Sequence, residues 1–125
     1  MKKYSIQNYL RYKNDVKQAV NRIEDKMWDE YTREELVIKF LPLVENIARK
    51  FSTSQQASGI MTIMDMIQSG SVGLVQASQK LDYEKWSESD DMEKKIKSFF
   101  AKRIKARYVD KLILTEVTYV YQSTR

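Results

Sequence analysis

The segment Asp65–Leu74 combines a carboxylate, an amide and two glycines within a run that otherwise reads as helix. An interior glycine costs a helix about 1 kcal/mol relative to alanine, so Gly70 and Gly73 on one face need a structural cause. The usual cause is an approach of another helix closer than a Cβ would allow. Tight packing in a bundle would explain the glycines alone. It would not explain why Asp65 and Gln68 are placed to face outward together, which indicates a docking surface.

Catalytic chemistry has few of its usual residues in this chain. Histidine and cysteine are both absent, so the common nucleophile–base pairs and the thiolate or imidazole metal sites lack their components. The 17 acidic residues show no paired spacing that suggests carboxylate chemistry. We therefore expect neither an enzyme nor a cofactor or metal site.

Positive charge is concentrated near the C-terminal end. Residues 92–112 have eight basic and two acidic side chains, a net of +6 against +5 for the whole chain. Such a segment is typical of a phosphate-binding surface. A solvated helix face is the alternative interpretation. The basic residues are Lys94, Lys95, Lys97, Lys102, Arg103, Lys105, Arg107 and Lys111.

Length and composition favour one all-α domain, a compact bundle of about four helices. The chain has 125 residues, of which 42% are hydrophobic, with one proline and three glycines. A sheet protein would need turn residues at shorter intervals. Because cysteines are absent and no apolar run approaches the length of a membrane span, we expect a cytoplasmic protein without a membrane partner.

Two helices are predicted in the N-terminal half. The first covers about Ile6 to Trp28 and has a loose apolar stripe. Thr32, with Glu35 in capping-box position, opens the second. Pro42 within the second helix implies a kink or a late start. The first stripe consists of Leu10, Val16 or Lys17, Val20 and Met27, and the second of Leu36, Phe40, Leu43, Val44, Ile47 and Phe51.

Two more helices are predicted at about Thr62 to Leu81 and Asp91 to Leu112. A polar loop over 52–59 and an acidic one over 82–91 precede them. The last helix turns Ile96, Phe99, Phe100, Ile104, Tyr108 and Leu112 inward. The tail at 115–121 alternates and is β-branched, but it is too short to form a sheet alone.

Three motifs, in order, resemble region 2 of the bacterial sigma-70 family, which binds RNA polymerase and the promoter −10 element. Residues 36–51 look like the family's first core helix, proline included. Residues 65–74, followed by Ala77 and 80–82, look like its Asp-Leu-Ile-Gln-x-Gly-x-x-Gly-Leu helix. Arg103-Ile104 with Tyr108, Asp110 and Leu112 is similar to the pattern of flagellar and stress-type sigmas. The likeness covers about Glu35 to Leu112.

The resemblance implies that the middle motif docks on the coiled coil of the polymerase β′ clamp. Positions 64, 68, 71 and 75 would share one helical stripe. Ser69 stands where primary sigmas often have an acid, so one salt bridge would be lost. The implied polymerase-binding residues are Met64, Asp65, Gln68, Ser69, Ser71 and Val75.

The resemblance also implies that the basic helix follows promoter DNA and holds the non-template strand, on which aromatic stacking contributes about 1–3 kcal/mol per base. Phe99 matches a tyrosine position of the family, whereas Lys102 and Arg103 replace the paired tryptophans of primary sigmas. The implied DNA-binding residues are Lys95, Phe99, Lys102, Arg103, Lys105 and Arg107, with Tyr83 and Trp86 from the preceding loop.

We thus expect an N-terminal helical segment at 1–30, a candidate region 1.2 equivalent, then a region 2-like domain at 31–112 and a tail at 113–125. With no −35-reading helix-turn-helix after Leu112, the chain resembles a reduced phage late-type sigma. That implies a separate coactivator at the polymerase flap. Two alternatives remain: a sigma mimic that occupies the clamp and inhibits or redirects transcription, and a basic helical domain that binds nucleic acid non-specifically.

Overall fold

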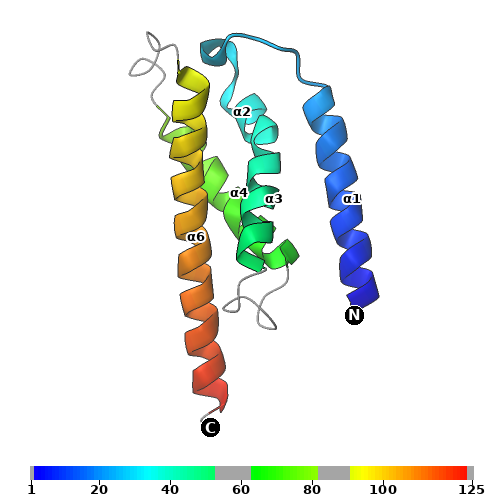
Figure 1. The fold of residues 1–125 in the computed structure, drawn as a ribbon, viewed down its shortest axis with the longest axis vertical. Coiled ribbons are helices and arrows are strands. Elements are labelled where there is room, and N and C mark those ends of the chain that lie inside the picture. The colour runs from blue at the N-terminus through cyan, green and yellow to red at the C-terminus, as the bar shows by residue number, and fades with distance from the viewer. Residues whose placement is uncertain (1, 53–62, 82–90, 124–125) are drawn as a thin grey trace.

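The structure, a computed structural model, describes residues 2–52, 63–81 and 91–123, with side chains between residues 7 and 110 of these ranges. Every regular element in the described ranges is helical, so the expected all-α bundle is confirmed (Figure 1). The elements are α1 (Lys2–Asn21), the 3₁₀ turn η1 (Trp28–Glu30), α2 (Arg33–Lys39), α3 (Leu41–Ser52), α4 (Ile63–Gln79) and α6 (Met92–Ser123).

The predicted capping box at Thr32 is present. The Glu35 amide donates to the Thr32 hydroxyl at 3.1 Å, and the Thr32 amide donates to the Glu35 carboxylate at 3.0 Å. The helix that it opens, α2, ends at Lys39, and α3 begins two residues later. Pro42 is the second residue of α3, where a missing N–H costs no helical hydrogen bond. The predicted kink or late start is therefore a break between two helices.

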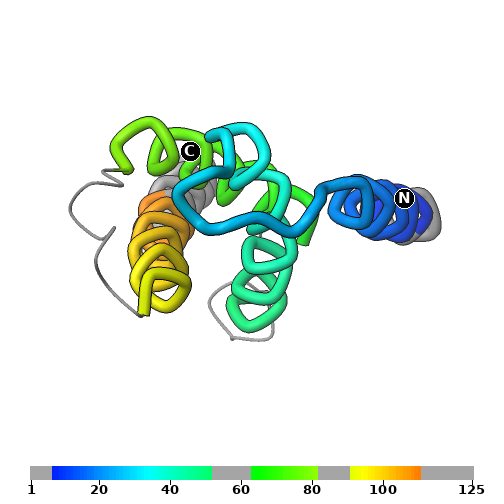
Figure 2. Tube along the Cα trace, turned by 90° about the horizontal axis from the view of Figure 1, so that it is seen from above, coloured from blue at the N-terminus to red at the C-terminus, as the bar shows by residue number. Residues whose placement is uncertain are grey.

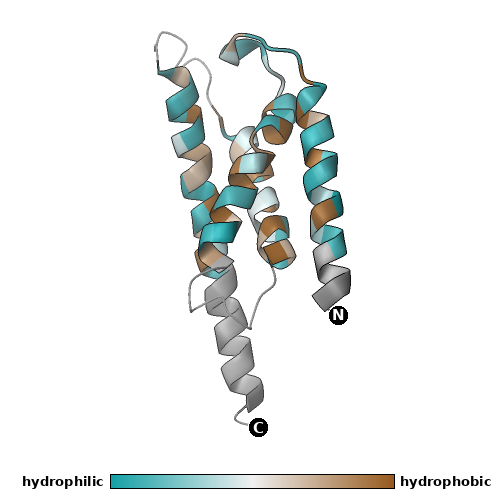
Figure 3. Cartoon of the chain, turned by 45° about the vertical axis from the view of Figure 1, so that its right-hand side comes forward, coloured by the Kyte–Doolittle hydropathy of each residue, from teal (hydrophilic) through white to brown (hydrophobic). Residues whose placement is uncertain are grey.

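α4 lies at the centre of the fold and packs against α2, α3 and α6. Hydrophobic and hydrophilic positions alternate along the helices, as expected when one face of each is buried (Figure 3). One continuous core runs from Tyr31 to Tyr108. Its largest fully buried side chains are Leu36, Val44, Met66, Ile67, Leu74, Ile96, Phe100, Ile104 and Tyr108.

The close approach predicted at the glycines is confirmed at the crossing of α4 with α6. A Cβ on Gly70 would overlap the Tyr108 ring, 2.6 Å from its Cζ atom, and one on Gly73 would stand 2.6 Å from Arg107 Cγ. The Tyr108 hydroxyl then donates to the Val44 carbonyl at 3.0 Å. Missing side chains on α4 thus let α6 reach across it to α3.

The prediction for the first helix was wrong in its end and in two members of its apolar stripe. α1 ends at Asn21, and Leu10 and Met27 are 58% and 69% exposed. Tyr9 and Tyr12 pack toward the core instead, because aromatic rings reach across a wider gap than leucine. Seen from above, α1 lies to one side of the other helices (Figure 2).

Trp28, predicted to end the first helix, belongs instead to η1 and packs beside the core. Its ring centroid lies 5.4 Å from that of Tyr31 and 5.8 Å from that of Phe40. The Lys39 ammonium stands 5.6 Å from the Trp28 ring. Aromatic packing around η1, rather than a continuation of α1, therefore holds the segment between α1 and α2 in place.

The last helix is longer than predicted, since α6 continues to Ser123 rather than ending at Leu112. The alternating β-branched residues of the tail at 115–121 would favour a strand only where a neighbouring strand could pair with them. A helix, in contrast, satisfies the hydrogen bonds of its own backbone groups. The two predicted loops lie largely outside the described residues.

Candidate functional site

The outer face of α4 presents a polar and apolar ridge to solvent. We define the α4 ridge as Asp65, Gln68, Val72 and Val75, which recur at i, i+3, i+7 and i+10 and share one helical face. All four are exposed, the two valines by 45% and 42%. The outward placement expected for Asp65 and Gln68 is therefore present. The ridge offers hydrogen-bonding groups at one end and apolar contact at the other.

Three other residues of the predicted polymerase-binding set lie beside the ridge rather than on it. Met64, Ser69 and Ser71 are half-buried. Met64 packs against the core, and the Ser71 hydroxyl donates to the Ile67 carbonyl at 2.7 Å. Val72, which the sequence analysis did not select, is on the ridge. Counting helical turns from Asp65 instead of from Met64 would have identified it.

A groove between α2 and α4 borders the ridge at Val75. Its volume is about 560 Å³. Val37 and Ile38 contribute apolar surface from α2, and Arg33 and Glu34 contribute charge near the start of that helix. Sequence analysis missed this groove, because it depends on how two helices pack and not on the pattern of either. Together, ridge and groove could receive side chains of a partner helix.

The predicted DNA-binding residues of α6 form a second, basic surface. Lys95, Lys102, Arg103 and Lys105 are exposed. Phe99 is half-buried and packs against the core, with its ring centroid 6.0 Å from that of Phe100. The Arg103 guanidinium lies 5.4 Å from the Phe99 ring, a cation–π arrangement.

Arg107 differs from the other basic residues of this set. It is half-buried in the crossing of α4 with α6, and its Nε atom is buried with no hydrogen bond in the described part of the chain. The stem of its side chain lies against Gly73. Arg107 is thus partly a packing residue. Tyr83 and Trp86 lie outside the described residues.

Comparisons with known proteins leave the chain without an assigned family. No family model matches it, and no curated protein or solved structure gives a significant match. Within the described ranges, no cluster of three or more acidic, histidine or cysteine side chains could hold a metal ion. None of the described helices is long and apolar enough to cross a membrane.

Proposed function

We propose that this protein is a sigma-like transcription initiation factor. It binds core RNA polymerase through the coiled coil of the β′ clamp and directs it to a −10-type promoter element. The observation that supports this most is the outward position of Asp65 and Gln68 within the middle motif. The packing of α4 against α6 accounts for Gly70 and Gly73 but does not require these two residue types on the exposed face.

The α4 ridge fits a helical protein partner better than it fits DNA. Its one charged side chain is acidic, and a carboxylate would repel phosphate. Val72 and Val75 supply apolar area, while Asp65 and Gln68 supply hydrogen bonds. Gln68 lies between the charged and the apolar part of the ridge, so we assign it a central contact.

The basic surface of α6 would carry the contacts with promoter DNA. Lys95, Lys102 and Lys105 suit a phosphate backbone because their ammonium groups are exposed and form no salt bridge with any described residue. Phe99 retains a partly open ring beside Arg103 for stacking on an unpaired base.

A second function, the sigma mimic, is favoured by Lys102 and Arg103. These residues stand where the resemblance places the tryptophans that wedge the duplex open in primary sigmas. A protein that occupied the clamp but stacked bases weakly would block the host sigma without opening promoters.

In vitro transcription with purified core polymerase on supercoiled bacteriophage DNA, with the start sites mapped by primer extension, tests both functions. New specific start sites support the initiation factor, and inhibition without new starts supports the mimic. A protein that does not co-purify with core polymerase contradicts both and favours non-specific nucleic-acid binding.

The docking surface is tested by Gln68→Ala. We expect weaker binding to core polymerase by about 1–3 kcal/mol, as for a central interface residue. Gln18→Ala is the matched control, because Gln18 is an exposed amide on α1. Equal dissociation constants for the two variants would remove Gln68 from the interface.

A further inference from the structure

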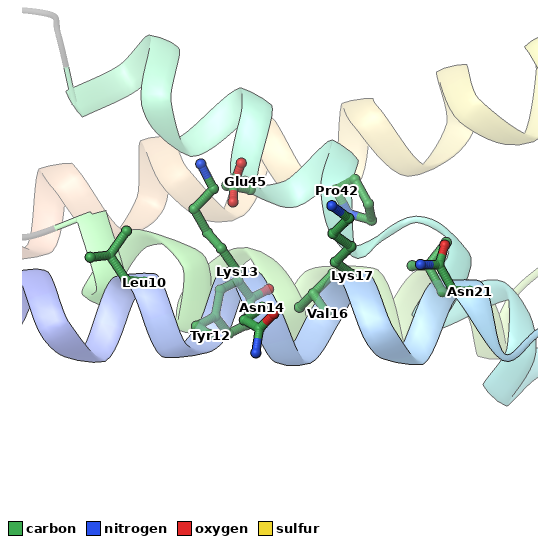
Figure 4. Close-up of a pocket in the computed structure, with 10 residues that line it drawn as sticks. Leu10, Tyr12, Lys13, Asn14, Val16, Lys17, Asn21, Pro42 and Glu45 are labelled. Atoms are coloured by element: carbon green, nitrogen blue, oxygen red, sulfur yellow. The ribbon is translucent and has the colours of Figure 1, made fainter.

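A groove of about 470 Å³ separates α1 from α3, on the side of α1 that faces the bundle (Figure 4). α1 provides most of the wall, and Pro42 and Glu45 provide the α3 side. We call it the α1–α3 groove. The residues that line it are Leu10, Tyr12, Lys13, Asn14, Val16, Lys17, Val20, Asn21, Pro42 and Glu45.

The apolar part of the groove follows α1 lengthwise. Leu10, Val16 and Val20 span ten residue steps on one helix, which correspond to about 15 Å or three turns. Leu10 is 58% exposed although it is a leucine. A long, shallow apolar channel of this kind matches a short helix better than a compact small molecule.

The charged side chains of the groove that form no salt bridge with a described residue are positive. Lys13 extends from α1 toward Glu45, and Lys17 extends toward Pro42 (Figure 4). The one acid of the lining, Glu45, already accepts from Arg49 at 2.8 Å. Within the described part of the chain, neither lysine forms a salt bridge. Lys13 instead lies 5.5 Å from the Tyr9 ring. Two cations that form no salt bridge with a described residue thus stand beside an open apolar channel.

We propose that the α1–α3 groove binds a short amphipathic helix of a partner protein, with acidic residues flanking its apolar stripe. The apolar stripe would cover Leu10, Val16 and Val20, and the acidic flank would pair with Lys13 and Lys17. The groove shares no lining residue with the α4 ridge, so this inference stands or falls separately from the proposed function.

The test uses two synthetic helical peptides of about 14 residues, roughly four turns. Both have leucines at i, i+4, i+7 and i+11; one has glutamates beside this stripe, and the other has lysines there. Fluorescence anisotropy with the full chain should show binding of the acidic peptide. The lysine peptide should bind about tenfold more weakly, because two ion pairs are replaced by repulsion.

Paired variants of the protein locate the site. The double change Lys13→Glu with Lys17→Glu should reverse the preference between the two peptides. Circular dichroism of this variant checks that the helices remain. The control is Lys94→Glu with Lys97→Glu, which makes the same change of charge at two exposed positions of α6 and should leave acidic-peptide binding unchanged.

Several outcomes would overturn the inference. These are no binding of either peptide, equal binding of both, or loss of binding in the α6 control variant. A fourth concerns nucleic acid: if the Lys13 and Lys17 changes weaken binding of a DNA duplex but not of the acidic peptide, the lysines serve a phosphate backbone instead.

Discussion

α4 meets α6 on one side and α1 on another, and the two contacts are built differently. Toward α6, Gly70 and Gly73 let the backbones come close, and the Tyr108 ring fills the space above Gly70. Toward α1, the contact depends on half-buried tyrosines. Leu10 stays exposed, and a groove remains open beside it.

The difference shows that the absence of side chains at Gly70 and Gly73 can bring two helices into closer contact than large side chains do. Dispersion attraction falls steeply as the distance between two helix surfaces grows. The close approach that two glycines allow therefore gains contacts that long side chains across a wider gap cannot provide. Tyr12 illustrates the other case. Its hydroxyl is buried without a hydrogen bond to any described residue, and burial is the main cause that raises its pKa.

The largest effect is expected from Gly70→Ala, which tests the tight crossing of α4 with α6. The new methyl group would occupy the position of the Tyr108 ring, so the ring must move and lose its bond to Val44. We expect a loss of about 3 kcal/mol of unfolding free energy in urea denaturation, from overpacking and one lost hydrogen bond. Val72→Ala, on the exposed side of the same helix, should cost less than about 0.5 kcal/mol. Similar losses for both would disprove the tight crossing.

Tyr108→Phe removes the hydroxyl and leaves the ring. The Val44 carbonyl then loses a partner at 3.0 Å, and we expect a loss of about 1–1.5 kcal/mol in the same measurement. Combined with Gly70→Ala, the loss should be smaller than the sum of the two, because the methyl group no longer meets the hydroxyl. Strict additivity would show that Gly70 and Tyr108 do not interact.

The segment that joins α1 to α2 is expected to respond to pH through Glu35. Its carboxylate accepts from the Thr32 backbone amide and from Lys26 in the segment after α1, and both contacts lower its pKa from the ordinary value. A lowered folded-state pKa stabilises the protein above the ordinary pKa. That contribution is lost as the pH falls through the lowered value. Glu35→Gln should therefore flatten the acid limb of a plot of unfolding temperature against pH. An unchanged limb would contradict this role.

The smallest effect is expected on the α1 side. Tyr12→Phe removes a buried hydroxyl that has no hydrogen bond in the described residues, so the unfolding free energy should change by less than about 0.5 kcal/mol. Comparison of its unfolding free energy with that of Tyr108→Phe measures how differently a tyrosine hydroxyl contributes to the two contacts of α4. A loss as large as that of Tyr108→Phe would show that the α1 hydroxyl has a partner after all.

Local signals in the sequence were sufficient for much of the fold. The capping box at Thr32 is a short-range pattern whose physical cause acts within a few residues. The glycine pair is also short in sequence, but its cause is the close approach of α6, so the pattern predicted an approach without naming the partner helix. The outward position of Gln68 follows from helical spacing in the same way. The inward face of α1, the α2–α4 groove and the role of Arg107 in packing could not be predicted. Each depends on the distance between helices, which no single segment encodes.

The bond from Tyr108 to Val44 joins positions 64 residues apart. Bringing such distant points together costs chain entropy that the formation of individual helices does not recover. Because the phenol passes directly over Gly70, we expect this bond to reach its native geometry only when α3, α4 and α6 have packed together. We therefore expect the core to assemble by the joint packing of three helices. Its slowest step should depend on contact order rather than on the rate at which any single helix forms.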